Sequence, residues 1–566
     1  MKSPFYHFKF IKFQPFISLL DCSDYIIFKN PAFKILILDF IKVIKGLESH
    51  IKNQRLSISY TKNLARMKKL LALISVFIVL MDLPVSSAMA NEYIVLARPL
   101  NLLGYVTQGG AFSLNDKNNY GTEKGLQSAL MNLFVEGDYK ISSELKFYGS
   151  SMLTVDWAYQ LNADRESWHE KLFSKSKDHL NVDNKYWQVL KEAHLTWTPG
   201  NFMFRIGKQI VSWGEMDGIR LMDQINPLDQ RRGFADVEFE TTIIPIWLIR
   251  ANYSLPVHLG WLQDLGFEFI FNPNADFIPN QPIRSGNDEG GIWAPNILIP
   301  GPFPFGEAHL GSTILNVKEP RRFNSNGFEY AFRVKCIVYD SIITLNYFYG
   351  LDNDPVAKSA GPPIITQASD GKLIIHPFLQ GKYPLFRFIG ATFSKDITPL
   401  KSALLGGVSP VVRFETLYAF KNIFVTTINT FDKSDEFRWA IGIDWKIKIP
   451  LLNPRAYFSV SPQFFHRKIM DYPSRYDLAD LEKNTYAVTL LIKTSYFNAK
   501  LVPSFFWLRD ITSQSDFFKL ELLYDYTHNW RFTLGTLLFH GEEKGKGYQR
   551  FDNKDQIYFK ITYRWS

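Results

Sequence analysis

From about residue 100 to the end of the chain, apolar and polar side chains alternate with a period of two. In 437–447, Phe, Trp and Ile occupy the odd positions, whereas Arg, Ala, Gly, Asp and Lys occupy the even ones. The segments 518–526 and 530–538 repeat this alternation on either side of a His528-Asn529 turn. A period of two is typical of β-strands. Because charged residues alternate with aromatic ones, the pattern predicts strands with one face toward lipid and the other toward water.

Applied to the whole chain, the pattern predicts an all-β fold, a transmembrane antiparallel β-barrel of about 18 strands, with 16 as the alternative count. Bacterial barrels have even strand numbers, which places both termini on the periplasmic side. The predicted strands begin near residues 102, 128, 143, 188, 202, 238, 258, 327, 341, 384, 409, 437, 454, 484, 500, 516, 530 and 554.

The connections between these strands alternate in length, which predicts short periplasmic turns and long extracellular loops. The 397–408 connection departs from this rule, because it is long on the side of the short turns. The short connections lie at 141–142, 198–201, 339–340, 498–499 and 528–529, and the long ones at 114–127, 161–187, 213–237, 272–326, 351–383, 421–436, 468–483 and 541–553.

Two of the long loops, 272–326 and 351–383, are rich in Pro and Gly. Such loops could fold back and plug the barrel, or they could remain solvated at the surface. The sequence leaves both alternatives open.

The composition supports a barrel in lipid. Aromatic residues make up 16% of the chain, with 48 Phe and 27 Tyr, yet 21% of residues are charged and the mean hydropathy is only −0.10. A helical membrane protein would instead show long apolar runs. The net charge of +9 is no indication of nucleic-acid binding, because residues 1–90 hold 13 of the 64 Lys and Arg and only 5 of the 55 Asp and Glu. The remaining 476 residues are therefore nearly neutral.

The start of the chain predicts a secretory signal peptide at 67–90 rather than at Met1. Lys68 and Lys69 form a positive region, 70–81 is an apolar core, and Ala88-Met89-Ala90 fits a cleavage site. The apolar core is too short to span a bilayer as a helix, and a retained anchor would need a longer run. We interpret 1–66 as a spurious upstream extension translated from a wrongly chosen start; the alternative is a genuine cytoplasmic extension. The barrel is then expected to comprise 91–566.

The last strand, 557–565, carries alternating aromatic and aliphatic residues and ends on Trp565, followed by Ser566. A terminal aromatic strand resembles the signal that barrel-insertion machinery reads. That machinery and outer-membrane lipids are the partners that the sequence predicts, with the outer membrane as location.

The stretch 202–236 is the most distinctive part of the chain. Its strand ends in Trp213-Gly214-Glu215, and a loop dense in both charge signs follows. Because glycine permits a sharp turn, such a loop could fold inward and narrow the pore. The alternative is a salt-bridged network that merely holds the loop. The candidate constriction residues are Arg205, Gln209, Glu215, Asp217, Arg220, Arg231 and Arg232.

The same stretch carries a family resemblance. Arg-Ile-Gly-Lys-Gln at 205–209, Trp-Gly-Glu at 213–215, Asp217-Gly218 and Asn-Pro-Leu at 226–228 resemble the core motif of an uncharacterised, domain-of-unknown-function family of large Gram-negative outer-membrane barrels. The resemblance implies a porin-like barrel in the outer membrane. Members of that family are often encoded near resistance-nodulation-division exporters, which implies traffic of lipids or hydrophobic compounds. The resemblance brings no catalytic residues.

The sequence favours transport over catalysis. It contains no G-x-S-x-G, H-E-x-x-H, P-loop or G-x-G-x-x-G motif, and we expect no cofactor and no metal. His194 faces the predicted lumen, where a lone histidine is usually polar lining. Charges of both signs line the predicted lumen, which argues for weak ion selectivity. Three hypotheses remain: a porin-like barrel that passes small or hydrophobic compounds or lipids alongside an envelope exporter, a barrel enzyme acting on lipids, and a structural barrel plugged by its own loops.

The predicted signal peptide gives a first testable outcome. If 67–90 is removed on export, N-terminal sequencing of protein purified from outer membranes should begin at Asn91. A membrane-inserted chain that begins at Met1 would contradict both the signal peptide and the interpretation of 1–66.

Overall fold

The computed structural model describes most of the chain after residue 90. The described ranges are 91–95, 98–114, 125–162, 180–233, 239–283, 298–303, 306–311, 313–367, 371–401, 406–473, 477–478, 481–543 and 545–565. The upstream extension and the signal peptide lie outside these residues, so both stay predictions. Among the described residues, no helix is both long and apolar enough to cross a membrane.

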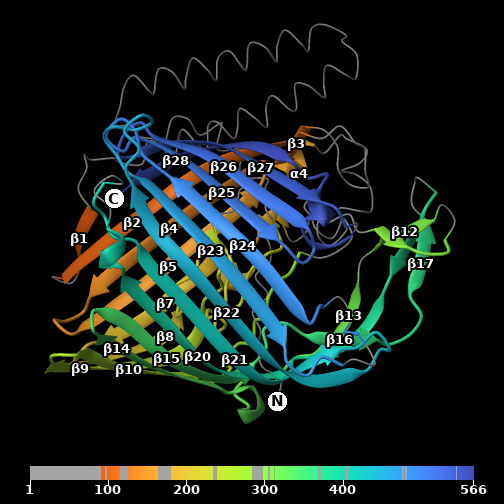
Figure 1. Cartoon of the computed structure of the whole chain (residues 1–566), viewed down its shortest axis with the longest axis horizontal. Coiled ribbons are helices and arrows are strands. Elements are labelled where there is room, and N and C mark those ends of the chain that lie inside the picture. The colour runs from red at the N-terminus through yellow and green to blue at the C-terminus, as the bar shows by residue number, and fades with distance from the viewer. Residues whose placement is uncertain are drawn as a thin grey trace, which may run out of the picture. The chain divides into compact units, whose positions relative to one another are not determined.

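The described strands form a closed, antiparallel, 18-stranded barrel, in which each wall strand pairs with two neighbours and the last pairs with the first (Figure 1). In order around the ring, the wall strands are β2 (Arg98–Ser113), β4 (Leu130–Lys140), β5 (Leu145–Asp156), β7 (Leu190–Trp197), β8 (Phe202–Gln209), β9 (Ile246–Leu259), β10 (Leu262–Asn272), β14 (Glu329–Val338), β15 (Ser341–Leu351), β20 (Leu385–Asp396), β21 (Val411–Val425), β22 (Phe431–Ile447), β23 (Phe458–Ile469), β24 (Asn484–Lys493), β25 (Leu501–Asp510), β26 (Ser515–Asp525), β27 (Trp530–Gly541) and β28 (Gln556–Trp565).

This architecture confirms the predicted fold class and the count of 18. Several details of the prediction are wrong. The strand predicted to begin near 238 begins only at Ile246, and the strand predicted to end in Trp213-Gly214-Glu215 ends at Gln209. The 421–436 connection is short, because β21 continues to Val425 and β22 already begins at Phe431. The apolar alternation fades near the ends of these two strands, which hid their true length.

The alternation predicted from the sequence determines which side of the wall each residue faces. Apolar side chains on the outward face are exposed, such as Ile206 (58%), Leu345 (60%) and Leu534 (51%). Inward polar residues such as Thr344 and Gln463 are buried. An outward apolar band with a polar interior is the arrangement of a transmembrane barrel.

The remaining described elements lie in the connections or at the rim. They are β1 (Asn91–Val95), β3 (Gly125–Ser128), α4 (Ala158–Leu161), β6 (Val182–Asp183), α7 (Tyr186–Val189), η2 (Phe239–Thr242), β11 (Leu298–Pro300), β12 (Glu307–Leu310), β13 (Ile314–Lys318), η4 (Ser325–Gly327), β16 (Val356–Ser359), β17 (Ile364–Gln367), β18 (Leu373–His376), β19 (Phe378–Lys382), η5 (Thr398–Leu400) and η7 (Gly547–Phe551).

The two Pro- and Gly-rich loops pair with each other in an arm beside the barrel (Figure 1). Strand β12 pairs with β18 and β13 pairs with β19, so the arm combines both loops. Its base is held at the β21–β22 turn, where the Asn429 side chain bonds both the N–H and the carbonyl of Ser359. The described strands of both loops therefore form the arm rather than a plug.

The face assignment predicts how charge affects stability. Ile441 lies within β22 and faces outward, with 39% of its surface exposed. Ile441→Lys should lower the free energy of unfolding by about 2–4 kcal/mol if the site lies near the bilayer midplane. Lys335→Glu is the matched control, because Lys335 is exposed on the inward face of β14 and charge is tolerated there. Denaturant unfolding in lipid vesicles measures both variants, and equal losses would contradict the assignment.

Candidate functional site

The chain between β8 and β9 does not form an outer loop but crosses the barrel interior. We call residues 210–233 the crossing segment. It leaves the end of β8 with the Ile210 N–H bonded to Glu192 Oε1 of β7 at 2.8 Å. The Trp213 indole, which is 1% exposed, then donates Nε1–H to Glu268 Oε2 of β10 at 2.9 Å. The segment is thus anchored on the wall close to the strands that it connects.

Its next residues reach the far wall. The backbone N–H groups of Glu215 and Met216 both donate to Glu415 Oε1 of β21, the second at 2.8 Å. The Asp217 carboxylate bonds Arg413 of β21 at 2.8 Å and Gln463 of β23 at 3.1 Å. Counted from β2 around the ring, β8 is the fifth strand and β23 the thirteenth of eighteen. The crossing segment therefore bridges nearly opposite sides of the barrel.

The turn of the crossing segment depends on Gly214 and Asp223. Asp223 Oδ1 accepts the N–H groups of Trp213 at 2.5 Å and Gly214 at 2.9 Å. A Cβ on Gly214 would lie 2.6 Å from Asp223 Oδ2 and 3.4 Å from Glu415 Oε1. A side chain at position 214 would displace the Asp223 carboxylate that accepts these N–H groups, which accounts for the glycine of the Trp213-Gly214-Glu215 motif.

The return path is apolar. Met222 is fully buried and fills the space beside Gly390 of β20, where a Cβ would lie 2.5 Å from the methionine methyl. It belongs to a cluster that joins the crossing segment to inward apolar residues of the wall: Val211, Trp213, Leu221, Met222 and Ile225 with Ile246, Leu248, Ile270, Ala331, Phe348, Phe386, Phe388, Leu417, Ala419, Ala440 and Phe465. Part of the lumen is therefore lined by apolar side chains.

Asn226 closes the crossing segment at its base. Its Oδ1 accepts the Val211 N–H at 2.7 Å, and its Nδ2 donates to the carbonyls of Gln209 at 3.2 Å and Ile244 at 3.0 Å. The Asn226 side chain thus links the start of the crossing segment, the part that returns to the wall and the residues just before β9. The following Pro227 and Leu228 continue this closure, since the Ile244 N–H bonds the Pro227 carbonyl.

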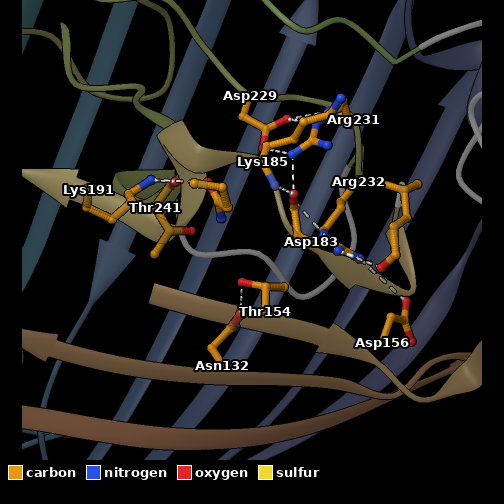
Figure 2. A network of polar contacts seen from close by, with 12 residues as sticks. Asn132, Thr154, Asp156, Asp183, Lys185, Lys191, Asp229, Arg231, Arg232 and Thr241 are labelled. Atoms are coloured by element: carbon orange, nitrogen blue, oxygen red, sulfur yellow. Dashed lines mark hydrogen bonds and ion pairs between the residues drawn. The ribbon is translucent and has the colours of Figure 1, made fainter. Parts of the chain in front are cut away.

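Arg231 and Arg232 lie in a buried network along the inner wall of β4 and β5 (Figure 2). Arg231 forms ion pairs with Asp183 at 2.5 Å and Asp229 at 2.8 Å, and its guanidinium stacks over Trp187. Arg232 lies 3.8 Å from Asp156 and donates to the Leu180 carbonyl. Burial, the largest effect, lowers the pKa of Arg231, but bonds and charge from Asp229 and Asp183 raise it above its usual value. These arginines fasten the end of the crossing segment.

The seven sequence-predicted residues therefore fall into four groups rather than one constriction. Glu215 and Asp217 lie at the far wall, and the Asp217 side chain is 57% exposed. Gln209 and Arg220 hold the base, where Gln209 Nε2 donates to the Leu248 carbonyl and Arg220 donates twice to the Asn226 carbonyl. Arg205 remains on β8, bonded to Thr196. Arg231 and Arg232 form the buried pair described above. The role of these seven residues in permeation stays a prediction.

Sequence reasoning missed the wall residues that hold the crossing segment, namely Glu268, Arg413 and Glu415. Arg413 and Glu415 belong to the charges of both signs along the predicted lumen, but no sequence feature singles them out. A buried glutamate that accepts backbone N–H groups from a segment 200 residues away has no local sequence pattern. Asp223 and Asn226 lie within the distinctive stretch, but only the geometry shows their bonds.

The family model described as protein of unknown function (DUF1302) matches residues 107–262. The family resemblance is confirmed. The matched region runs from β2 to the start of β10 and contains the whole crossing segment. A comparison with curated protein sequences finds no match.

Solved outer-membrane structures are similar at low identity. Acinetobacter baumannii OccAB4 has 8% identity and a TM-score of 0.42, with 84% of this chain and 100% of that chain covered. The BenF-like porin from Pseudomonas fluorescens Pf-5 has 8% identity and a TM-score of 0.41, with 84% and 99% covered. Pseudomonas aeruginosa OccK8 (OprE) has 9% identity and a TM-score of 0.38, with 82% and 97% covered. The closed ring of paired strands, rather than these similarities, establishes the fold here.

The closure of the crossing segment at Asn226 can be tested by proteolysis. Asn226→Ala removes three hydrogen bonds at a residue that is 1% exposed, so local opening should become easier by about 2–3 kcal/mol. Trypsin should then cut within 210–233 at least roughly tenfold faster, while the barrel still shifts in mobility on boiling. Ser212→Ala is the matched control, because this exposed hydroxyl makes only a 3.4 Å bond to Asp223. Equal cleavage rates in the two variants would exclude the role of Asn226.

Proposed function

We propose that this chain is an outer-membrane, porin-like channel for small or hydrophobic compounds, and that the crossing segment is its constriction. The observation that carries the proposal is the bridge from β8 to β21 and β23, which divides a closed barrel between nearly opposite walls. A segment in that place contacts whatever passes through the interior. Protein dipoles, charges and apolar groups that line a constriction determine what a channel passes.

The lining supports hydrophobic or amphiphilic cargo. A second apolar cluster faces the tip of the crossing segment and consists of Ala111, Leu508, Phe517, Leu537, Phe539, Phe551 and Tyr558, with Ile219, Ile283, Phe506 and Tyr548 packed against it. Ile219, at the tip, thus meets apolar wall residues, while Asp217 beside it meets Arg413. A water-filled pore for ions alone needs no such apolar interior.

A plugged structural barrel is the second candidate function, and one observation favours it. The crossing segment is bonded to the wall at both ends and at its tip, through Glu192, Glu268, Glu415 and Asp183. A plug needs that kind of attachment. A conducting channel needs passage on either side of the segment, so conductance separates the two functions.

We also propose that the barrel is not an enzyme. His194, the lumen histidine considered for catalysis, stacks on Tyr148 and lies 3.4 Å from the Thr196 hydroxyl. This arrangement supports a lining role rather than a nucleophile–base pair. Cooperation with an inner-membrane exporter, insertion by the barrel-assembly machinery and contact with outer-membrane lipids remain parts of the same proposal.

Shortening the crossing segment tests the proposed function. Replacing 216–221 by two glycines removes the tip and its bonds to Arg413 and Gln463, while Asn226 and the arginine network remain. Single-channel conductance in planar bilayers should rise severalfold because the constriction is withdrawn, and cells should become more sensitive to large antibiotics.

Deleting Pro362 and Pro363 is the control, because these exposed residues belong to the arm. It should leave conductance unchanged. An unaltered conductance in the shortened variant, with the barrel still shifting on boiling, would contradict the constriction. A wild-type barrel and a shortened barrel that both fail to conduct would favour the structural alternative.

A further inference from the structure

A cavity of about 240 Å³ lies in the inner wall next to the anchor of the crossing segment. Strands β9, β10 and β14 form it, and its inward side chains are Arg250, Asn252, Ser254, Glu268, Arg333 and Lys335. These residues alternate with outward, exposed ones such as Ile249, Phe269 and Phe332, so the cavity belongs to the lumen side. It therefore opens toward the interior that the crossing segment spans.

Two polar atoms of the lining are buried without a partner. Arg333 Nε and Asn252 Oδ1 both lack a hydrogen bond among the described residues. Within the same part of the chain, Arg333 forms no ion pair, although it lies directly across from Glu268 in the register of β10 and β14. Buried polar groups are nearly always hydrogen-bonded in folded proteins. The Arg333 Nε–H is a donor and therefore points to an acceptor, a ligand or water, that bonds it, whereas Asn252 Oδ1 is an acceptor and needs a donor.

The charge of the lining is predominantly positive. Three of its residues are cationic, and Glu268 is the one carboxylate among them, already paired with Arg250. Arg205 stands directly opposite Arg250 in the register of β8 and β9 and adds a fourth positive charge beside the cavity. Like charges at paired positions are unfavourable, and an anion in the cavity would relieve this repulsion. Guanidinium groups are well suited to bind carboxylate and phosphate.

From this lining we infer that the cavity is an anion-binding subsite for the carboxylate or phosphate end of an amphiphilic compound. Arg333 and Lys335 hold the anion, and the Asn252 amide N–H and the Ser254 hydroxyl donate further hydrogen bonds. The apolar part of the compound would lie against the apolar cluster around Trp213, which Glu268 joins to the cavity wall. This inference rests on the proposed channel function and names its substrate class, organic anions.

Binding to the full-length barrel in detergent tests the subsite without requiring conductance. Benzoate, titrated calorimetrically, should bind the wild type, whereas benzamide, its neutral counterpart of the same shape, should not. The double variant Arg333→Gln, Lys335→Gln should weaken benzoate binding at least tenfold, and Lys335→Gln alone should weaken it less. Lys519→Gln is the matched control, because Lys519 faces the lumen from β26, eight strands away from β14, and pairs there with Glu521.

Each outcome decides for or against the subsite. Equal benzoate affinity in the double variant and in Lys519→Gln, equal binding of benzamide, or no binding of benzoate by the wild type would overturn it. Competition by inorganic phosphate would show that the subsite recognises negative charge alone, and its absence would assign the subsite to organic carboxylates. The single Lys335→Gln variant, at an exposed side chain, keeps the test decisive if the double variant fails to fold.

The experiments distinguish a failure of the proposed channel constriction from a failure of the proposed anion subsite. If benzoate does not bind but the shortened crossing segment raises conductance, the subsite is wrong and the channel stands. If benzoate binds and conductance does not respond to shortening, the cavity is a binding site and the proposed constriction is wrong.

Discussion

The structure depends on the closure of the wall between its first and last strands. Residues 104–113 of β2 pair with 556–565 of β28, so no strand of the ring has a free edge. A sheet in lipid must close in this way, because lipid cannot bond exposed N–H and C=O groups. Closure of eighteen strands also encloses an interior wide enough for a chain segment to cross it. The position of the crossing segment is therefore a consequence of the barrel rather than an addition to it.

A segment inside the barrel brings its own backbone groups, and these need partners. The crossing segment has no regular secondary structure, so side-chain oxygens replace the ladder of a sheet. Glu192, Asp223, Asn226 and Glu415 each accept one or more of its N–H groups. This requirement explains why acidic residues occur on the wall beside apolar ones. It also explains why the motif residues include an amide and a glycine that a surface loop would not need.

The sequence predicted the fold well. One face of each wall strand meets lipid and the other meets water, so apolar and polar residues alternate visibly along the sequence. It predicted that 205–236 differs from the other connections, because charge density and the Trp213-Gly214 pair are local features. It offered a salt-bridged network as an alternative for this loop, but it did not identify Asp183, Asp229 and Asp156 as the partners of Arg231 and Arg232. Those pairings depend on how two connections and strand β5 meet in space. It also left the arm unrecognised, since β12 and β18 pair across more than 60 residues.

Glu268 connects the crossing segment to the wall cavity. One of its carboxylate oxygens accepts the Trp213 indole, and the other pairs with Arg250, which lines the cavity. A charge that enters the cavity acts on Arg250 and, through the shared carboxylate, on the bond that anchors the crossing segment. Because a partly buried ion pair is only weakly screened by solvent, this coupling is stronger than between surface charges. If the crossing segment is the proposed constriction, Glu268 would therefore couple the charge bound in the cavity to the bond that holds the constriction in place.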